Sequence, residues 1–327
     1  MRLTKEGLEQ QRNERLGKEN FNKTGELMKV VEYNSSSDVI VEFQDEWKRK
    51  NKTTWYRFKK GSVRNPHNDE RIGLENYNNQ GCLMKVVDYK RYDDVTIEFQ
   101  DEYKTQIKTF WCAFESGEIK NPYYPSVYNV GITGNKYPAW ENGEDTKEYK
   151  AWYGMIRRCY AEKLKNKYKT YKDVTCCDEW LLFDNFYEWL HSQENFDKWY
   201  NGDRWEVDKD IIVKGNKVYS PETCCLVPHC VNTIFIKSGS TRGDLPIGVY
   251  KDSKNNRYKA ATIYGRNNNE SKITLYYYPS IEDAFYLGYK PSKEAYIKRV
   301  AQEEYDKGNI TQRCYEAMMN YEVEITD

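Results

Sequence analysis

The N-terminal half of this chain contains an internal repeat without gaps, which limits its fold more than any other feature. Residues 16–66 recur as residues 72–122, so that residue 72 corresponds to residue 16, a shift of 56 positions. The matches include LMKVV at 27–31 and 83–87, EFQDE at 42–46 and 98–102, and Asn-Pro at 65–66 and 121–122. Two copies predict a tandem module, because a solenoid needs three or more repeats.

Each copy carries the pattern of half-buried β-strands. Apolar and polar residues alternate over 39–43 and again over 95–99, which is the period of a strand with one buried face. Polar gaps at 34–37 and 90–93 predict hairpin loops. We therefore expect four or five short strands per copy, closed as a small SH3-like barrel, in domains spanning residues 1–70 and 71–130.

The first copy also interleaves basic and aromatic residues. This pattern is typical of a nucleic-acid surface, where charge meets phosphates and rings meet bases. A solvated hairpin whose aromatics belong to the core explains it equally well. The second copy is less basic, so the copies could differ in partner. The residues concerned in the first copy are Lys48, Arg49, Lys50, Lys52, Arg57, Lys59, Lys60 and Arg64, with Trp47, Trp55 and Tyr56 among them.

Composition excludes several classes of protein. The 327 residues include 51 Lys and Arg against 51 Asp and Glu, which argues against a uniformly basic nucleic-acid binder and leaves local charge to decide. No apolar run is long enough to span a membrane, and the N-terminus lacks the apolar core of a signal peptide. We expect a cytoplasmic protein with reduced cysteines. The nine cysteines show no C-x-x-C spacing, so we expect no zinc site.

The central region begins with a helical pattern and a strongly basic stretch. Apolar residues from Tyr149 to Cys159 share one helical face after Thr146. The window 157–172 then contains seven basic residues and one acidic residue, and a second helix is predicted from about Leu182 to Trp199. We expect phosphate contacts from this window; a solvated helix end is the alternative. The candidates are Arg157, Arg158, Lys163, Lys165, Lys167 and Lys169.

The stretch from Trp205 to Phe235 predicts a ββα unit. A strand over 205–212 is followed by turn residues at 214–216 and 220–221, and a second strand covers 223–227. Pro228 suits the first position of a helix. Asp208 would lie on the first strand and Asn232 on the helix.

This unit resembles the ββα-metal core of HNH endonucleases, in the divergent form found in phage homing-endonuclease-like proteins. The resemblance implies that Asp208 and Asn232 bind a divalent metal such as Mg²⁺, with waters and a DNA phosphate. Lys209 occupies the position of the family's general base, yet an ordinary lysine is protonated at neutral pH and is a poor base. His229 could supply that base from another backbone position. The alternative is that Asp208 and Asn232 are solvated polar residues.

The C-terminal region predicts three short strands, at 247–250, 257–263 and 273–278, and a helix entered at Ser280. With the phrase GVYKDSKNNRYKAATI and the later EDAF and KEAYIKRVA, it resembles the AP2-type DNA-binding domain of phage HNH proteins. The resemblance implies that the sheet enters the major groove. The matching basic residues are Lys251, Lys254, Arg257, Lys259 and Arg266.

We therefore expect an α+β, multidomain chain, with an HNH-like domain at 131–238 and an AP2-like domain at 239–327. The leading function is a phage-type double-stranded DNA-binding protein with a degenerate HNH-like core. One alternative is an active Mg²⁺-dependent homing or nicking endonuclease in a bacterial host cell. Another is an interaction protein that binds and inhibits a host defence complex, favoured by acidic residues in the repeats at 42, 45, 46, 98, 101 and 102.

Overall fold

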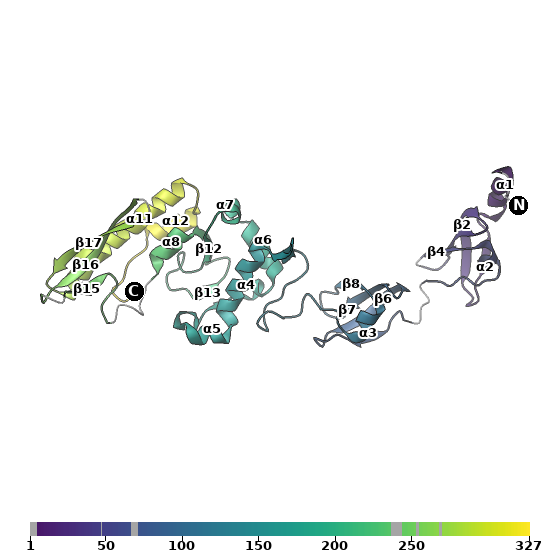
Figure 1. Ribbon diagram of the computed structural model, residues 1–327, viewed down its shortest axis with the longest axis horizontal. Helices are drawn as coiled ribbons and strands as arrows, with labels where there is room; N and C mark the ends of the chain where they lie inside the picture. The colour runs from purple at the N-terminus through teal and green to yellow at the C-terminus, as the bar shows by residue number, and fades with distance from the viewer. Residues whose placement is uncertain (1–4, 47, 67–70, 237–243, 253–254, 268–269) are drawn as a thin grey trace. The chain divides into compact units, whose positions relative to one another are not determined.

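The computed structural model describes residues 5–46, 48–66, 71–236, 244–252, 255–267 and 270–327, with side chains of 262–274 left undescribed. It is a mixed α+β chain with several small antiparallel sheets (Figure 1). Its backbone separates into two compact units, Met1–Tyr124 and Pro125–Asp327. No helix in the described part is long and apolar enough to cross a membrane.

Each repeat forms one open four-stranded antiparallel sheet with sequential strand order. The SH3-like barrel was therefore wrong: the described strands close no barrel, because the first and fourth strands of each sheet are its two edges. A short helix follows each sheet. The first copy comprises α1 (Lys5–Arg15), β1 (Glu19–Phe21), β2 (Leu27–Ser35), β3 (Asp38–Phe43), β4 (Lys50–Thr53) and α2 (Trp55–Lys59). The second comprises β5 (Glu75–Tyr77), β6 (Leu83–Arg91), β7 (Asp94–Phe99), β8 (Gln106–Thr109) and α3 (Trp111–Ser116).

Each repeat buries an apolar core of its own. The alternating residues of β2 and β3 face the helix α2 and are buried, as are their counterparts in β6 and β7. The core of the first copy consists of Met28, Val30, Tyr33, Val39, Val41, Phe43, Phe58 and Val63. The second consists of Met84, Val86, Tyr89, Val95, Ile97, Phe99, Phe114 and Ile119.

An arginine packed between two rings recurs in both copies. The guanidinium of Arg15 lies 5.0 Å from the ring centre of Tyr33 and 4.7 Å from that of Trp55. Arg71 makes the equivalent contacts at 4.6 and 5.0 Å, with Tyr89 and Trp111. Such cation–π contacts contribute about 0.5 to 2 kcal/mol each, so the arginine belongs to the fold of the module.

Two glycines, one in each repeat, have left-handed backbone in different surroundings. Gly61 has φ +60°, and a Cβ there would lie 2.7 Å from the backbone oxygen of Phe21. Gly81, in the turn between β5 and β6 of the second repeat, has φ +82° with nothing within 4 Å of the position that a Cβ would take. Only the first position is fixed by both conformation and space.

The second unit opens with helices around an aromatic core. Helix α4 begins directly after Thr146, as the sequence pattern predicts, and Thr146 caps it by accepting a hydrogen bond from the backbone N–H of Tyr149. The elements are β9 (Trp140–Glu141), β10 (Glu144–Asp145), α4 (Lys147–Tyr160), α5 (Glu162–Lys167), η1 (Lys169–Tyr171), β11 (Thr175–Cys176), η2 (Asp178–Leu181), α6 (Phe183–His191) and α7 (Phe196–Asn201).

The helix predicted from Leu182 to Trp199 is in fact two helices, α6 and α7. The chain breaks between them because the buried amide of Asn195 donates to the backbone oxygens of Leu226 and Asn309. These long-range bonds hold residue 195 at the helix start.

The predicted ββα unit is present. β12 (Trp205–Asp208) pairs antiparallel with β14 (Cys225–Pro228), and α8 (His229–Asn232) follows directly, with η3 (Thr233–Phe235) after it. Both strands are shorter than expected. Between them β13 (Val218–Tyr219) pairs in parallel with β11, which joins the unit to the preceding helices.

The C-terminal region folds as three antiparallel strands followed by helices, as its sequence predicts. Register aligns Val249 with Ala260, and Ala260 with Tyr276, so β16 is the central strand. Helix α11 lies against β16 (Figure 1). The elements are β15 (Val249–Lys251), β16 (Tyr258–Asn267), β17 (Glu270–Tyr278), α10 (Ile281–Asp283), the π-helical η4 (Ala284–Tyr289), α11 (Lys290–Asp306) and α12 (Gln312–Met319).

One apolar core joins the ββα unit to this C-terminal region. Val227 and Val231 from the ββα unit pack in the same cluster as Ala260, Phe285 and Ile297. This core crosses the expected domain boundary between residues 238 and 239. A separate aromatic core, with Trp152, Trp180 and Phe183 at its centre, holds the helices α4 and α6 together.

Candidate functional site

Asp208 ends β12, where its carboxylate organises the following turn. Its Oδ1 accepts hydrogen bonds from the backbone N–H groups of Asp210, at 2.7 Å, and Ile211, at 2.9 Å. Burial raises the pKa of the Asp208 carboxyl above its ordinary value. Oδ1 is thus used in hydrogen bonds that hold the turn, and Oδ2 is the oxygen that Asp208 could offer to a cation.

Lys209 is buried, with only 6% of its surface exposed. Its Nζ lies 2.6 Å from Asp210 Oδ2 and donates to the backbone oxygen of Asn216 at 3.2 Å. The ammonium also lies 5.6 Å from the ring centre of Tyr219. These contacts hold the side chain in place across the 209–216 turn, so the geometry favours a structural role over proton abstraction.

His229 and Asn232 belong to α8, and Asp208 lies at the other end of the strand pair. Trp205 is aligned with Pro228 and Asp208 with Cys225, so Asp208 is about 10 Å from the Trp205–Pro228 pair at about 3.3 Å per residue. His229 Nδ1 lies 3.2 Å from Glu206 Oε1. The structure therefore does not bring His229 to Asp208 as a replacement base.

The positions of Asp208, His229 and Asn232 give little support to the predicted metal site. Asn232 makes no side-chain hydrogen bond within the described part of the chain and is half-buried. No group of three His, Cys, Asp or Glu side chains in that part is placed to hold a metal ion. The oxygens of Asp208 and Asn232 suit Mg²⁺ chemically, and their joint role remains a prediction. None of the nine cysteines, all of which the structure describes, forms a disulfide bond.

The basic segment, defined as residues 157–172, surrounds α5 and η1. None of its seven cations makes an ion pair with a described residue, and five of them are exposed. The exposed ones are Arg157, Lys163, Lys167, Lys169 and Lys172. Lys165 is half-buried near the ring of Tyr160, 6.0 Å from its centre.

Arg158 connects the basic segment to the ββα unit. Its Nε donates to the Tyr219 hydroxyl at 2.9 Å, and its guanidinium lies 5.4 Å from the centre of that ring. Because Lys209 lies near the same ring, Tyr219 is positioned between two cations from distant parts of the sequence. Burial raises the pKa of the Tyr219 hydroxyl, which keeps it neutral. Through this contact the basic segment meets the ββα unit.

The basic DNA-binding candidates of the C-terminal region differ in exposure and in ion pairing. Lys251 and Arg257 are exposed. Lys259 Nζ lies 3.4 Å from the buried carboxylate of Asp252 and 5.2 Å from the ring centre of Tyr277. Lys254 lies outside the described residues, and Arg266 lies in β16 with its side chain undescribed.

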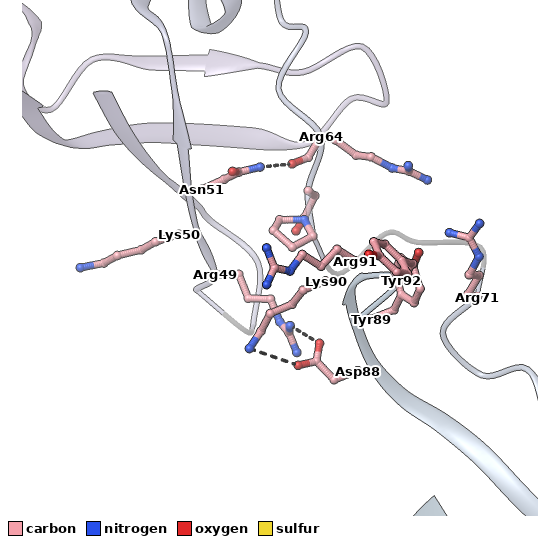
Figure 2. A pocket seen from close by; sticks show the side chains of 12 residues that line it. Arg49, Lys50, Asn51, Arg64, Arg71, Asp88, Tyr89, Lys90, Arg91 and Tyr92 are labelled. Carbon is pink, nitrogen blue, oxygen red and sulfur yellow. Dashed lines mark hydrogen bonds and ion pairs between the residues drawn. The ribbon is translucent and has the colours of Figure 1, made fainter. Parts of the chain in front are cut away.

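A cleft of about 800 Å³ within the first unit is lined by basic side chains from both repeats (Figure 2). Its charges are largely compensated by carboxylates. Arg49 and Lys90 are paired with Asp88, and Arg91 lies 2.7 Å from the carboxylate of Asp93. The basic run of the first repeat is thus partly satisfied within the chain.

Sequence reasoning placed Tyr250 and Tyr258 near the basic residues of the C-terminal sheet but missed Tyr219 and Tyr277. Tyr219 reaches Arg158 and Lys209 because β13 pairs with β11, and a two-residue strand leaves no periodic signal. Tyr277 could have been found from strand alternation, which places it with Tyr250 on the face away from the helix.

Comparisons of this chain with protein-family models, with curated proteins and with solved structures find no match.

Proposed function

We propose that this chain binds double-stranded DNA through the basic segment, beside a ββα unit that is a degenerate HNH-like core. The supporting observation is a run of seven cations without an ion pair among the described residues, tied to that unit by Arg158, Tyr219 and Lys209. Uncompensated cations attract the phosphate backbone and release its counterions on binding.

The geometry of α5 favours contact with a charged backbone. Lys163 and Lys167 are four residues apart on this helix, so they project from one face about 6 Å apart. Lys169 and Lys172 extend the exposed charge past the helix end. This arrangement gives affinity without reading sequence, since phosphate contacts carry no sequence information.

Cleavage has weaker support than binding. A general base must accept a proton, and the Lys209 ammonium is already paired with Asp210. We call the HNH-like core degenerate because, among its described residues, it lacks a side chain in position to act as the general base. The exposed residues Lys251 and Arg257 stay candidates for further DNA contacts.

The interaction-protein alternative loses part of its basis. Asp45 accepts from the amide of Asn65, and Asp101 accepts from that of Asn121. Glu98 accepts from Gln106. These acidic residues hold each repeat together, so they offer less free charge to a host protein.

Fluorescence anisotropy of a labelled duplex, measured over a range of salt concentrations, tests duplex binding. The triple variant Lys163→Ser, Lys167→Ser, Lys169→Ser should weaken binding at low salt. It should also flatten the plot of log K against log salt by up to about 2.7, at about 0.9 per lost phosphate contact. The matched control removes three charges from the repeats, at Lys29, Lys52 and Lys85, which are paired with acids. Equal effects of the two triple variants would contradict the proposal.

A plasmid assay with Mg²⁺ or Mn²⁺ tests cleavage separately. We expect no nicking by the wild-type chain under conditions where it binds the plasmid. Nicks that disappear in Asp208→Ala would establish the endonuclease alternative instead. Restoration of nicking by Lys209→His would show that only the base is missing.

A further inference from the structure

One face of the C-terminal sheet carries a row of exposed aromatic rings. Register places Tyr250 of β15 opposite Lys259 of β16, and Lys259 opposite Tyr277 of β17, so all three project from the same face. Tyr250 is 52% exposed and Tyr277 is 54% exposed. Leu275, on the same face, is also exposed.

The helices cover only the opposite face. Val249 and Ala260 are aligned and buried, and Tyr258 packs against the same core as Phe285 and Ile297. Because side chains alternate along a strand, the row of rings faces away from α11. Nothing in the described part of the chain packs over Tyr250 or Tyr277 closely enough to bury them.

This face offers a ligand exposed rings for stacking and little uncompensated charge. Lys259 is held by the Asp252 carboxylate and lies over Tyr277, so its charge is partly neutralised and its stem fixes the space between the two tyrosines. Arg257 stands at the edge of the face, is exposed, and makes no ion pair with a described residue. A ligand that fits must offer flat rings together with negative charge.

We propose that this face binds single-stranded nucleic acid, with unpaired bases stacked on Tyr250 and Tyr277 and the backbone reaching Arg257. The two tyrosines are separated by two interstrand spacings, about 10 Å, which leaves room for a base on each ring. Exposed rings on a sheet, bordered by basic residues, are how proteins bind bases that have left the double helix. The inference goes beyond duplex binding by the basic segment: of the residues used here, only Arg257 is also a candidate for duplex contacts.

The test is a titration of labelled oligothymidine and oligouridine, each about 20 nucleotides long, with the full-length chain. Tyr250→Leu and Tyr277→Leu should each weaken binding of the preferred oligomer about tenfold or more, since one stacked base contributes that much. Tighter binding of one oligomer identifies DNA or RNA as the ligand. The matched control is Tyr276→Leu, which changes an exposed tyrosine on the other face of the same strand.

Several results would overturn the proposal. Wild-type chain that binds neither oligomer refutes it, and so does a Tyr276→Leu variant that loses as much affinity as the other two. The Lys163, Lys167 and Lys169 triple variant separates the two sites: it should retain at least half of the oligomer affinity while losing the duplex. Retained circular dichroism in each tyrosine variant shows that the sheet is still folded.

Discussion

Replacement of Lys293 by methionine should stabilise the second unit, because this half-buried lysine places its charge against a largely apolar cavity. It projects from α11 into a cavity of about 20 Å³ lined by residues such as Ile297 and Tyr289. Its Nζ donates to the backbone oxygen of Ile234 at 2.7 Å. Asp327 lines the same cavity, but its carboxylate is paired with Lys214. Burial lowers the pKa of Lys293 to about 8.

The magnitude follows from that pKa and the ordinary lysine value of about 10.4. Below about pH 8 Lys293 is protonated in both the folded and the unfolded chain. Burial of the charged form then destabilises the folded chain by about 3 kcal/mol, at 1.36 kcal/mol per pKa unit. As pH rises from about 8 to about 10.4, only the folded chain loses the proton, and stability increases. The cost at pH 9.5 is therefore about 1.2 kcal/mol.

Methionine removes this cost but also removes the hydrogen bond to Ile234, which contributes about 1 kcal/mol. Lys293→Met should thus raise the free energy of unfolding by about 2 kcal/mol at pH 7 and by only about 0.2 kcal/mol at pH 9.5. The assay is urea unfolding of the full chain, followed by hydrogen exchange of α11 peptides at both pH values. The control is Lys298→Met, an exposed site on the same helix. A gain that is equal at the two pH values would refute the argument from burial.

Three further predictions follow from single contacts. Tyr219→Phe removes the hydroxyl that accepts from Arg158 and should weaken duplex binding several-fold in the anisotropy assay, with circular dichroism unchanged. Gly61→Ala should destabilise the first repeat by about 2 to 4 kcal/mol in thermal unfolding, through left-handed backbone and a backbone clash, whereas Gly81→Ala, in open space, should cost about 1 to 2 kcal/mol. Trp152→Phe removes a buried indole hydrogen bond to a backbone oxygen and should cost about 2 kcal/mol or more in urea unfolding; a neutral result would show that the bond adds nothing.

Local periodicity predicted the strands of the repeats, the ββα order and the three C-terminal strands, because each has a buried face with a regular period. The barrel was wrong because alternation is the same in an open sheet and a closed one, and closure depends on whether the first and fourth strands pair. The break before α7 depends on the contacts of Asn195 with Leu226 and Asn309, which no local pattern contains.

The candidate site likewise has features that the sequence shows and features that only the fold determines. The charge of the basic segment and the position of Asp208 at a strand end are visible in the sequence. The pairing of Lys209 with Asp210, and the position of Lys209 beside Tyr219, are not visible in the sequence. They depend on the fold of the loop that connects Lys209 to Tyr219. Whether a lysine is free or paired is a property of the folded chain.

The separate cores of the two repeats have a consequence for how the N-terminal half can change over time. Each copy closes its own core, and the cross-repeat ion pair between Arg49 and Asp88 joins partly exposed groups, which contribute about 1 kcal/mol or less. Loss or gain of one copy would therefore leave its neighbour folded. Copy number at this end of the chain is free to vary, and each copy should melt as an independent transition with its own midpoint.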